Sequence, residues 1–387
     1  MRMRPDPNPL LLQLVADGTP GGGTTVVLGL CEDVLKDGRW RLAFVSQRDS
    51  YALRTAQGLG VDTFGLDFDG PRFSTTRLLA LWRLIRRLRP SLIHVHGARA
   101  GLPVALVHLL RREGVGLVYT VHGLHFTMKP VLPRVLGALA EGVIARRADA
   151  TVYVSNGDLT KARAWHIAPG PTRVTRTIFN GIEPADLDRT QPRRTTLDLV
   201  FVGRLVRQKN PLLLVELMEA LRGSGITLGV VGGGELEADL KRGLHERGLA
   251  DQVTLFGKLD RSATIDVMRS ARLCVFPSLW EGLPVTPIEA SYLGIPVIAS
   301  DIPGTDEVVI DGHNGVLVAG FDATVYAGHV KRLLSDAAEL EQLGQRGREL
   351  VASRFLRDRC SANYLGLYAE LAGRQERRAD RRAGAAW

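Results

Sequence analysis

The sequence predicts an α/β protein built from two Rossmann-like, doubly wound domains, each a parallel β-sheet wrapped by helices. Short apolar runs rich in β-forming residues alternate with helical segments along the whole chain, which is typical of parallel sheets. The 387 residues, 45% of them hydrophobic and 24% charged, are enough for two full cores. Ligands of such sheets bind beyond the carboxyl ends of the strands, so we expect the site in a cleft between the two domains.

The expected strands fall into two sets separated by a polar segment. Residues 190–196 contain proline and lack apolar periodicity, so we place the linker at 188–196. The first domain then covers 1–187 and the second covers 197–354. Residues 355–387 form a helix and a basic tail that we expect to pack back toward the first domain and to fray at its end. The expected strands are 10–16, 42–46, 92–96, 117–121, 151–154 and 173–179, then 197–202, 226–231, 253–256, 273–276 and 296–299.

The excess positive charge lies in the first half of the chain. Residues 1–187 contain 24 Lys and Arg against 15 Asp and Glu, whereas residues 188–387 contain 26 of each kind. The net charge of +9 therefore belongs to the first half alone. Such a bias suits an anionic partner such as a membrane surface, a lipid phosphate or nucleic acid.

Cysteine usage and hydropathy favour a cytoplasmic protein. Cys31, Cys274 and Cys360 are odd in number and far apart, which predicts free thiols in a reducing compartment. No secretory signal is visible, and no apolar run approaches the roughly 18 residues that a membrane span needs. We therefore expect a cytoplasmic protein that is at most peripheral on the inner face of the membrane.

The stretch 278–291 is the strongest candidate site. The apolar run 273–276 before it predicts a buried strand. Thr286, Pro287 and Glu289 after it predict a capping box at a helix start. The stretch is therefore expected to form a strand end, a glycine-containing loop and a helix N-terminus.

That loop contains groups suited to a ligand with hydroxyls at one end and an anion at the other. A helix start offers unpaired N–H groups, and Gly282, followed by Leu283, allows close approach of a ligand to the backbone. Glu281 and Glu289 flank these donors. A nucleotide-sugar fits this description. The alternative is that Glu289 only caps its helix and Glu281 is a solvated loop residue.

A basic loop follows the first strand of the second domain. Gly203 begins it, and Arg204 and Lys209 stand just beyond the carboxyl end of the strand. A guanidinium can bind two phosphate oxygens at once, and an ammonium supplies a point charge. Gly233 lies in a glycine turn after the next strand, where a ligand can again approach the backbone. The alternative is a solvated basic loop with an ordinary turn beside it.

The first domain offers weaker candidates. Gly21, Gly22 and Gly23 follow a strand and open a helix, a place where free amides can meet a phosphate. They lack the Gly-x-Gly-x-x-Gly spacing of a dinucleotide fold and the lysine of a Walker loop. His122 follows the strand 117–121, where an open-sheet active site would place a side chain, although a lone histidine there is more often structural.

We propose no metal site from the sequence. His94, His96 and His125 match no metal-binding spacing. Asp67 and Asp69 form an Asp-x-Asp pair that can chelate a divalent ion, but they lie in a polar loop with no strong strand before them. We therefore interpret this pair as a solvated turn.

Two helical segments combine apolar and basic residues. Residues 73–89 place Leu78, Leu81, Trp82, Ile85 and Leu88 on one face and five arginines around it, namely Arg77, Arg83, Arg86, Arg87 and Arg89. Residues 130–147 form a second apolar segment with arginines. Either segment suits an anionic membrane surface. The alternative for each is a core-packed helix with a basic outer face.

Together these motifs resemble the retaining GT-B glycosyltransferases of glycosyltransferase family 4. The resemblance covers nearly the whole chain and is strongest over residues 200–318. The matching motifs are the Glu-x7-Glu pair Glu281 and Glu289, the phosphate clamp Gly203, Arg204 and Lys209, the turn 180–183, and, more loosely, the loop 301–307.

The resemblance implies a role for each candidate. Arg204 and Lys209 would neutralise the departing diphosphate. Glu289 would hold the ribose, and Glu281, Gly282 and Leu283 would contact the sugar. His122 would lie near the sugar, and Gly21, Gly22 and Gly23 near the phosphates or the acceptor. The enzyme would move a hexose from a nucleotide diphosphate-sugar, expected to be a UDP-sugar, with retention of configuration and without metal or cofactor.

The resemblance also implies an acceptor class and leaves rivals open. The acceptor would be a glycan or a lipid-linked sugar in cell-surface polysaccharide or glycolipid synthesis, and nucleic acid is not expected. A nucleotide-sugar epimerase and a non-catalytic nucleotide-binding protein on the same fold are the alternatives. The missing Gly-x-Gly-x-x-Gly disfavours a nicotinamide oxidoreductase.

Overall fold

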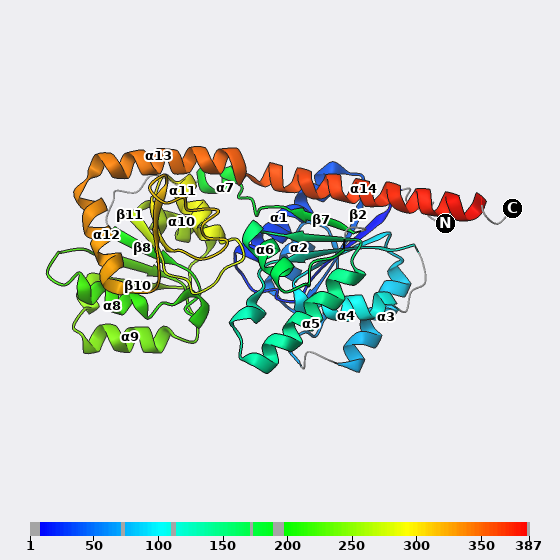
Figure 1. Ribbon diagram of the computed structural model, residues 1–387, viewed down its shortest axis with the longest axis horizontal. Coiled ribbons are helices and arrows are strands. Elements are labelled where there is room, and N and C mark those ends of the chain that lie inside the picture. Colours follow the sequence, from blue (N-terminus) through cyan, green and yellow to red (C-terminus); the bar gives the residue numbers. More distant parts are fainter. Residues whose placement is uncertain (1–7, 71–73, 110–113, 171–172, 189–196, 385–387) are drawn as a thin grey trace. The chain divides into compact units, whose positions relative to one another are not determined.

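The computed structural model describes residues 8–70, 74–109, 114–170, 173–188 and 197–384 (Figure 1). The chain divides into two compact units. The first unit is Met1–Asn180 together with Arg357–Trp387, and the second is Gly181–Leu356. Among the described residues, no helix combines the length and the apolar character needed to cross a bilayer.

The first unit contains a parallel sheet in the order β3-β2-β1-β4-β5-β6-β7. Alternate residues of its strands enter two separate cores, as the period of two in a strand requires: Leu10, Leu12 and Leu14 face one side, and Leu11 and Val15 face the other. The strands are β1 (Leu10–Val15), β2 (Arg41–Gln47), β3 (Asp62–Leu66), β4 (Leu92–His96), β5 (Gly116–Val121), β6 (Ala150–Tyr153) and β7 (Val174–Thr177).

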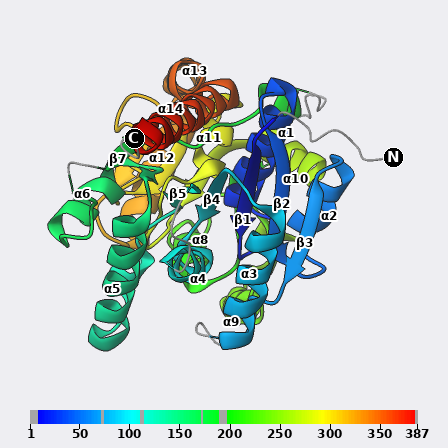
Figure 2. The ribbon, with the colours of Figure 1, turned by 90° about the vertical axis from the view of Figure 1, so that its right-hand side faces the viewer.

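Helices cover both faces of this sheet (Figure 2). The helices on one face are α3 (Thr75–Leu88), α4 (Ala98–Leu109) and α5 (Val131–Arg147), which share a core with the strands. The opposite face holds α1 (Gly22–Asp37), α2 (Tyr51–Gly58) and the C-terminal helix α14 (Arg357–Gly384). A further helix, α6 (Asn156–Ala164), lies between β6 and β7 in the chain.

The second unit repeats the same strand order in the sheet β10-β9-β8-β11-β12-β13. Its strands are β8 (Leu197–Val202), β9 (Leu228–Val231), β10 (Val253–Gly257), β11 (Ala271–Phe276), β12 (Val297–Ser300) and β13 (Gly315–Val318). Figure 1 shows α8 (Leu213–Ala220) and α9 (Glu237–Glu246) on one side of this sheet. On the other side are α10 (Arg261–Arg269), α11 (Val285–Tyr292) and α13 (Ala337–Arg354), whereas α12 (Ala323–Ser335) packs against α8.

The predicted fold class is confirmed: both units are doubly wound parallel sheets. In each sheet the direction of winding reverses at one place, between β1 and β4 in the first unit and between β8 and β11 in the second. Such switch points are where open α/β sheets bind their ligands. The two strands that sequence analysis did not find, β3 and β13, lie at sheet edges.

The units divide the chain at Asn180, before the expected boundary at residue 187. Two contacts hold residues 181–188 to the second unit. Ile182 N donates to Phe355 O at 2.9 Å, and the short helix α7 (Pro184–Asp188) contacts α10. Apart from Asp188, the expected linker 188–196 lies outside the described residues.

The C-terminal helix is longer than expected, whereas residues 385–387 at the expected frayed end lie outside the described residues. One helix, α14, continues from Arg357 to Gly384. Its apolar side Tyr364, Leu367, Tyr368 and Leu371 is buried against the first unit, which explains why it belongs there.

The two basic helical segments pack in different ways. In α3 the apolar face enters the core, and Arg77 is also buried, donating from Nε to Asp67 O at 2.6 Å. Arg77 is therefore not part of the basic outer face that the sequence predicted, whereas Arg83, Arg86, Arg87 and Arg89 are exposed.

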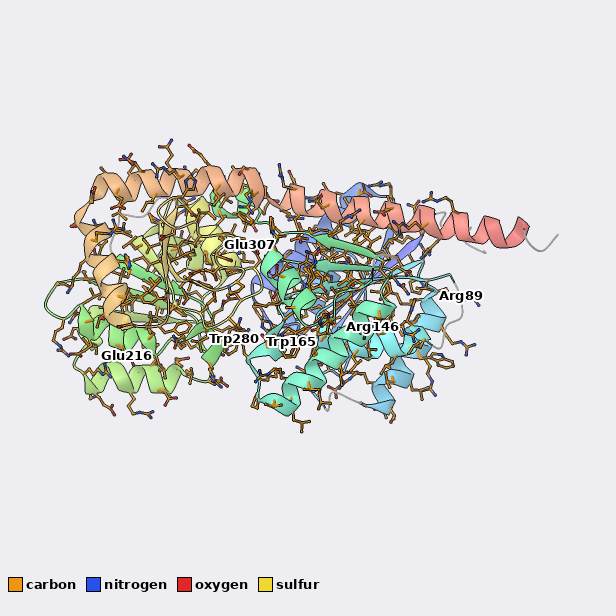
Figure 3. The ribbon with its side chains drawn as sticks, in the orientation of Figure 1. Arg89, Arg146, Trp165, Glu216, Trp280 and Glu307 are labelled. Carbon is orange, nitrogen blue, oxygen red and sulfur yellow. The ribbon has the colours of Figure 1, made fainter. Side chains whose placement is uncertain are left out.

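The beginning of α5 exposes an apolar surface. Only the second half of this helix is buried, at Glu141, Gly142, Ile144 and Ala145. We call the exposed residues of this helix, together with Met128 just before it, the α5 apolar patch; its members, which are 46–72% exposed, are Met128, Val131, Leu132, Val135, Leu136 and Leu139. Figure 3 shows Arg89 at the end of α3 and Arg146 near the end of α5.

Candidate functional site

The main candidate residues of the second unit lie at its switch point. Strands β8 and β11 are neighbours, and the chain leaves them at Val202 and Phe276. The predicted basic loop 203–209 follows β8, and the predicted acidic loop 277–284 follows β11. The strand order therefore brings together two loops that are about 70 residues apart in the sequence.

Lys209 and Glu281 form the central contact of this site. Lys209 Nζ lies 2.5 Å from Glu281 Oε1, and the two side chains are 14% and 7% exposed. The ammonium also lies 4.5 Å from the centre of the Phe276 ring, a favourable cation–π position. Because both charges are largely removed from water, each depends on the other for stabilisation.

Gln208 supports the same carboxylate and was not predicted. Its Nε2 donates to Glu281 Oε2 at 3.3 Å and to Trp280 O at 3.0 Å, and Gln208 O accepts from Leu279 N at 2.8 Å. These bonds join the two loops. Trp280, in the loop after β11, is labelled in Figure 3. Its position directly before Lys209 was the only sequence signal that could have identified it.

Arg204 has a different environment from Lys209. It is exposed just beyond β8, and it forms no ion pair with any described residue. The structure thus brings Lys209 to Glu281 and leaves the Arg204 guanidinium at the surface of the same loop.

The predicted capping box at Thr286 and Glu289 is wrong. Helix α11 begins at Val285 after Pro284, and no side chain caps it. Because the helix starts earlier than expected, Glu289 lies beyond the first turn and is buried. Its Oε1 accepts from Arg261 Nη1 at 2.7 Å.

Arg261 links two acidic groups at this place. It lies at the start of α10 and also binds Asp186 at 3.2 Å through Nε. Burial raises the pKa of Glu289, and the Arg261 charge opposes that effect. Arg261 therefore favours the ionised form of a buried carboxylate, and no sequence pattern distinguished it.

The glycine turn after β9 is explained by backbone packing. Gly232 has a φ of 139°, and a Cβ there would collide with the carbonyl oxygen of Gly203. A Cβ on Gly234 would collide with Leu205 O. A Cβ on Gly233 would instead meet the flexible Lys258 side chain, so its role in donor binding stays a prediction.

Two buried hydroxyls lie in the loops after β11 and β12. Ser278 Oγ and Thr305 Oγ1 have no hydrogen-bond partner among the described residues. Gly282 and Leu283 are buried in the first of these loops. Unpaired buried hydroxyls are uncommon, and with less than 1 Å² of each oxygen exposed neither is open to a ligand in this conformation.

The first unit holds the remaining candidates. Helix α1 begins at Gly22 with Gly21 as N-cap, and the space that a Cβ would occupy at Gly21 or Gly23 is open. His122 follows β5 and is half-buried, with Nε2 3.0 Å from Nδ1 of His96. These residues belong to the first unit, whereas Lys209 and Glu281 belong to the second.

Among the described residues, no cluster of three or more His, Cys, Asp or Glu side chains could hold a metal ion. Asp67 and Asp69 are exposed in a turn where Asp67 Oδ1 accepts from Asp69 N at 2.9 Å. Contrary to the sequence analysis, a strand does precede them, the edge strand β3.

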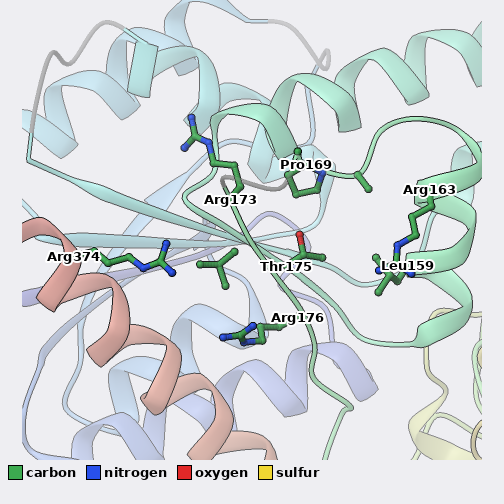
Figure 4. A pocket seen from close by; sticks show the side chains of 10 residues that line it. Leu159, Arg163, Pro169, Arg173, Thr175, Arg176 and Arg374 are labelled. Atoms are coloured by element: carbon green, nitrogen blue, oxygen red, sulfur yellow. The ribbon is translucent and has the colours of Figure 1, made fainter.

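A cavity of about 490 Å³ lies elsewhere in the first unit, beside β7 and α14 (Figure 4). None of the predicted site residues lines it. Arg173 in its wall pairs with Asp149, and Arg176 and Arg374 both pair with Glu370. Its positive charge is thus partly neutralised, and the switch point of the second unit remains the stronger candidate site.

Comparison with known proteins identifies the family of the chain. Residues 20–186 match Glycosyltransferase Family 4, and residues 184–350 match Glycosyl transferases group 1. The chain is 25% identical over 319 residues to the alpha-D-kanosaminyltransferase of Streptomyces kanamyceticus, covering 76% of this chain and 82% of that protein. It is 30% identical over 279 residues to D-inositol 3-phosphate glycosyltransferase 1 of Catenulispora acidiphila, covering 65% and 66%.

Solved structures share the fold. HepE of Anabaena, in complex with UDP and glucose, superposes with a TM-score of 0.79 at 18% identity, covering 94% of this chain and all of that one. The sucrose-phosphate synthase of Thermosynechococcus elongatus gives a TM-score of 0.76 at 22% identity, covering 94% and 99%. The chain therefore belongs to glycosyltransferase family 4, the retaining GT-B glycosyltransferases that transfer a sugar from a nucleotide-sugar donor.

Proposed function

We propose that the protein transfers a hexose from a UDP-sugar to a lipid-linked sugar or glycan acceptor, without a metal ion, in the synthesis of a cell-surface polysaccharide or glycolipid. The main support is the Lys209–Glu281 pair at the switch point of the second unit. It holds a cation and a carboxylate together where the fold binds its ligands.

Charge stabilisation explains how the site works without metal. The departing diphosphate gains negative charge. The exposed Arg204 supplies a positive charge, and Lys209, whose charge Glu281 partly offsets, supplies a second from the same loop. Because Glu281 and Gln208 already hold this loop, little reorganisation is needed when the charge develops. Retention then follows from attack on the same face as the leaving diphosphate, which accepts the proton of the acceptor.

Glu289 suits the ribose of the donor. Arg261 occupies only Oε1 of this carboxylate, and a carboxylate can accept several hydrogen bonds through its second oxygen. A ribose diol supplies two donors for Oε2. Arg261 is accordingly proposed to keep Glu289 ionised for this contact.

Relatives support a uridine donor and a lipid-linked acceptor. HepE was solved with UDP-glucose. A relative from Escherichia coli, 26% identical over 280 residues, is named UDP-Gal:alpha-D-GlcNAc-diphosphoundecaprenol alpha-1,3-galactosyltransferase. An acceptor of that kind would place the enzyme at the inner face of the membrane.

The charge of the two units favours such a location. The first unit contains 31 Lys and Arg against 17 Asp and Glu, a net charge of +14, whereas the second contains 19 against 24, a net charge of −5. Grouping α14 with the first unit thus increases the difference in net charge between the two units. A basic surface is attracted to anionic lipids with about 1 kcal/mol per residue close to the membrane.

The α5 apolar patch supplies the second half of a membrane contact. Exposed leucines and valines on a helix gain free energy when they enter the lipid interface. Arg83, Arg86 and Arg87 on α3 would add the electrostatic attraction. Apolar and basic groups together favour a lipid surface over a soluble glycan.

A donor panel tests the proposed function. The purified full-length protein is incubated with a set of nucleotide-sugars, with and without lipid-linked acceptors, and released nucleoside diphosphate is measured. The proposal expects UDP release from one UDP-sugar, increased by a lipid-linked acceptor and unchanged by EDTA. Conversion of one nucleotide-sugar into another without nucleotide release would indicate an epimerase. Binding without turnover of any donor would indicate a non-catalytic protein.

A further inference from the structure

A chain of hydrogen bonds joins the C-terminal helix to His122 through the interior of the first unit. Figures 1 and 2 show α14 along the side of the sheet that also holds α1. The members of the chain are at most 4% exposed and come from β1, β4, β5 and α14: Gln13, His94, His96, Thr120, Tyr364 and Tyr368. We call this set, together with His122 at its end, the α14–His122 network. So many buried polar groups are costly unless they are mutually paired.

The histidines of the network are neutral. Burial lowers the pKa of His94 and His96 well below the usual range, and it lowers the pKa of His122 to about 4. At neutral pH each ring therefore has one N–H donor and one acceptor nitrogen. In such a chain, the proton position of one ring determines that of the next.

Gln13 sets the direction of the bonds, because its amide has a donor end and an acceptor end. Its Oε1 lies 2.8 Å from His96 Nε2, so this nitrogen holds the proton of His96. Its Nε2 donates to the Tyr368 hydroxyl at 3.0 Å. The Tyr368 hydroxyl therefore donates its own proton in a hydrogen bond to His94 Nδ1 at 2.6 Å.

The remaining bonds follow from these two ends. His94 Nε2 has the proton of that ring and donates to Thr120 Oγ1 at 2.7 Å. Thr120 Oγ1 also forms a hydrogen bond with the Tyr364 hydroxyl at 3.1 Å. In the other direction, His96 Nδ1 must be an acceptor. It therefore accepts the N–H of His122 Nε2 at 3.0 Å.

We infer that Gln13 and Tyr368 are positioning residues that hold His122 as the neutral Nε2–H tautomer and leave its Nδ1 as a hydrogen-bond acceptor. In this form Nδ1 can accept a bond from a sugar hydroxyl and cannot donate one. The contact with a sugar rests on the proposed function, whereas the tautomer does not. The C-terminal helix thereby contributes to the chemistry of a residue at the end of β5.

One alternative proton order exists and is distinguishable. If the Gln13 amide were turned by 180°, every bond of the network would reverse, and His122 would hold its proton on Nδ1. The two orders give His122 opposite tautomers. A measurement of which ring nitrogen is protonated therefore decides between them.

Nitrogen NMR makes this measurement on the full-length protein. Long-range ¹H–¹⁵N correlation spectra of protein labelled with ¹⁵N-histidine separate protonated from unprotonated ring nitrogens. The His122 signals are assigned by their loss in His122→Gln. We expect a protonated Nε2 and an unprotonated Nδ1 at pH 7.5. A protonated Nδ1, or a mixture of both forms in the unmodified protein, would overturn the inference.

Tyr368→Phe tests the long-range part. It removes the acceptor for Gln13 and the donor for His94, so the Gln13 amide is no longer held in one orientation. Each bond biases the equilibrium several-fold, and we expect the tautomer ratio at His122 to shift by roughly tenfold. An unchanged ratio in a folded Tyr368→Phe protein would show that α14 does not position His122.

Tyr326→Phe is the matched control. It removes a buried phenol whose hydroxyl binds Ser300 at 2.8 Å in the second unit, outside the network. The His122 spectrum should not change in this variant. If Tyr368→Phe does not fold, Gln13→Met replaces it, because that variant removes the amide that sets the direction. An unchanged His122 tautomer in Gln13→Met would equally refute the inference.

Kinetics separate this inference from the proposed function. Tyr368→Phe should lower kcat with any active donor in the same direction as His122→Ala, but less, with KM for the donor changed less than twofold. If no nucleotide-sugar is turned over, the proposed function fails, and the NMR result on the tautomer still stands or falls by itself.

Discussion

Removal of the Lys209 charge should destabilise the second unit as well as reduce transfer. In Lys209→Met, Glu281 would remain as a buried carboxylate whose strongest partner is missing. Loss of one member of a buried pair costs about 3–5 kcal/mol, and the residual 14% and 7% exposure of these side chains favours the lower value, about 3 kcal/mol. For a unit of this size the melting temperature falls by about 2–4 °C per kcal/mol, which predicts a decrease of about 6–12 °C.

A second substitution shows whether the loss comes from the orphaned carboxylate. Glu281→Gln in the Lys209→Met protein removes the uncompensated charge, so the double variant should recover at least about 1 kcal/mol of the lost stability. Lys241→Met is the matched control in the same unit. It breaks an exposed pair with Glu237, whose side chains are 57% and 36% exposed, and should cost no more than about 0.5 kcal/mol.

Differential scanning calorimetry measures five proteins: the unmodified protein, Lys209→Met, Glu281→Gln, the double variant and Lys241→Met. The reasoning is refuted if the effects of Lys209→Met and Glu281→Gln are additive within about 0.5 kcal/mol, because contacting charges should be coupled. It is also refuted if Lys209→Met is as mild as Lys241→Met.

Four other predictions follow from the same contacts. Arg204→Ala should lower kcat by roughly 100-fold in the UDP-release assay, as for a lost charge stabiliser, and near-normal turnover of a folded variant would exclude that role. Transfer should survive EDTA and the double change Asp67→Asn with Asp69→Asn; rescue of an EDTA-inactivated enzyme by Mg²⁺ or Mn²⁺ would contradict metal-free charge stabilisation. Replacing Arg83, Arg86 and Arg87 by Gln should weaken binding to anionic liposomes by about 3 kcal/mol. Binding should also decrease with salt, because the attraction is screened over about 10 Å at 0.1 M. Equal co-sedimentation of the unmodified protein and the triple variant would mean that the basic side of α3 is only solvated. Burial raises the pKa of Glu141 from 4.5 to about 7, so its unfavourable ionisation destabilises the folded state as pH rises from about 4.5 through 7. In thermal unfolding, Glu141→Gln should therefore raise stability by about 3 kcal/mol at pH 8 but not at pH 4. Equal effects at both pH values would contradict the shifted pKa.

The fold was accessible from the sequence because buried parallel strands are nearly continuous apolar runs. Strands such as β1 and β11 are bounded by glycine or proline and are simple to recognise. The edge strand β3 has no fully buried residue and lacks that pattern, whereas β13 is a short apolar run, Gly315–Val318, that the sequence analysis did not assign to a strand. For β3, the neighbouring strand β2 rather than its own composition makes it a strand.

The site was predictable only to the level of single loops. Lys209 and Glu281 were identified from motifs, and the strand order explains their contact. The Glu289–Arg261 pair joins residues on different helices, and nothing local in the sequence indicates it. The helix start at Val285 also depends on tertiary context, since Thr286 and Pro287 form a good capping sequence that the chain does not use.

The length of α14 shows the same limit. Residues 374–384 lack an apolar face, so the sequence pattern did not indicate that the helix continues to Gly384. In the structure the buried tyrosines and leucines of its first half anchor one long helix, and ion pairs such as Arg374–Glu370 extend it.

Calorimetric titration of UDP into the full-length protein tests the central claim most directly, since that claim places the nucleotide at the switch point of the second unit. The unmodified protein should bind UDP, and Glu289→Ala should bind it at least about tenfold more weakly, as expected for lost hydrogen bonds to a charged group. Glu237→Ala, which removes an exposed carboxylate of the same unit, should bind UDP as the unmodified protein does. Equal affinity of the unmodified protein and Glu289→Ala, or no binding of UDP at all, would contradict the account.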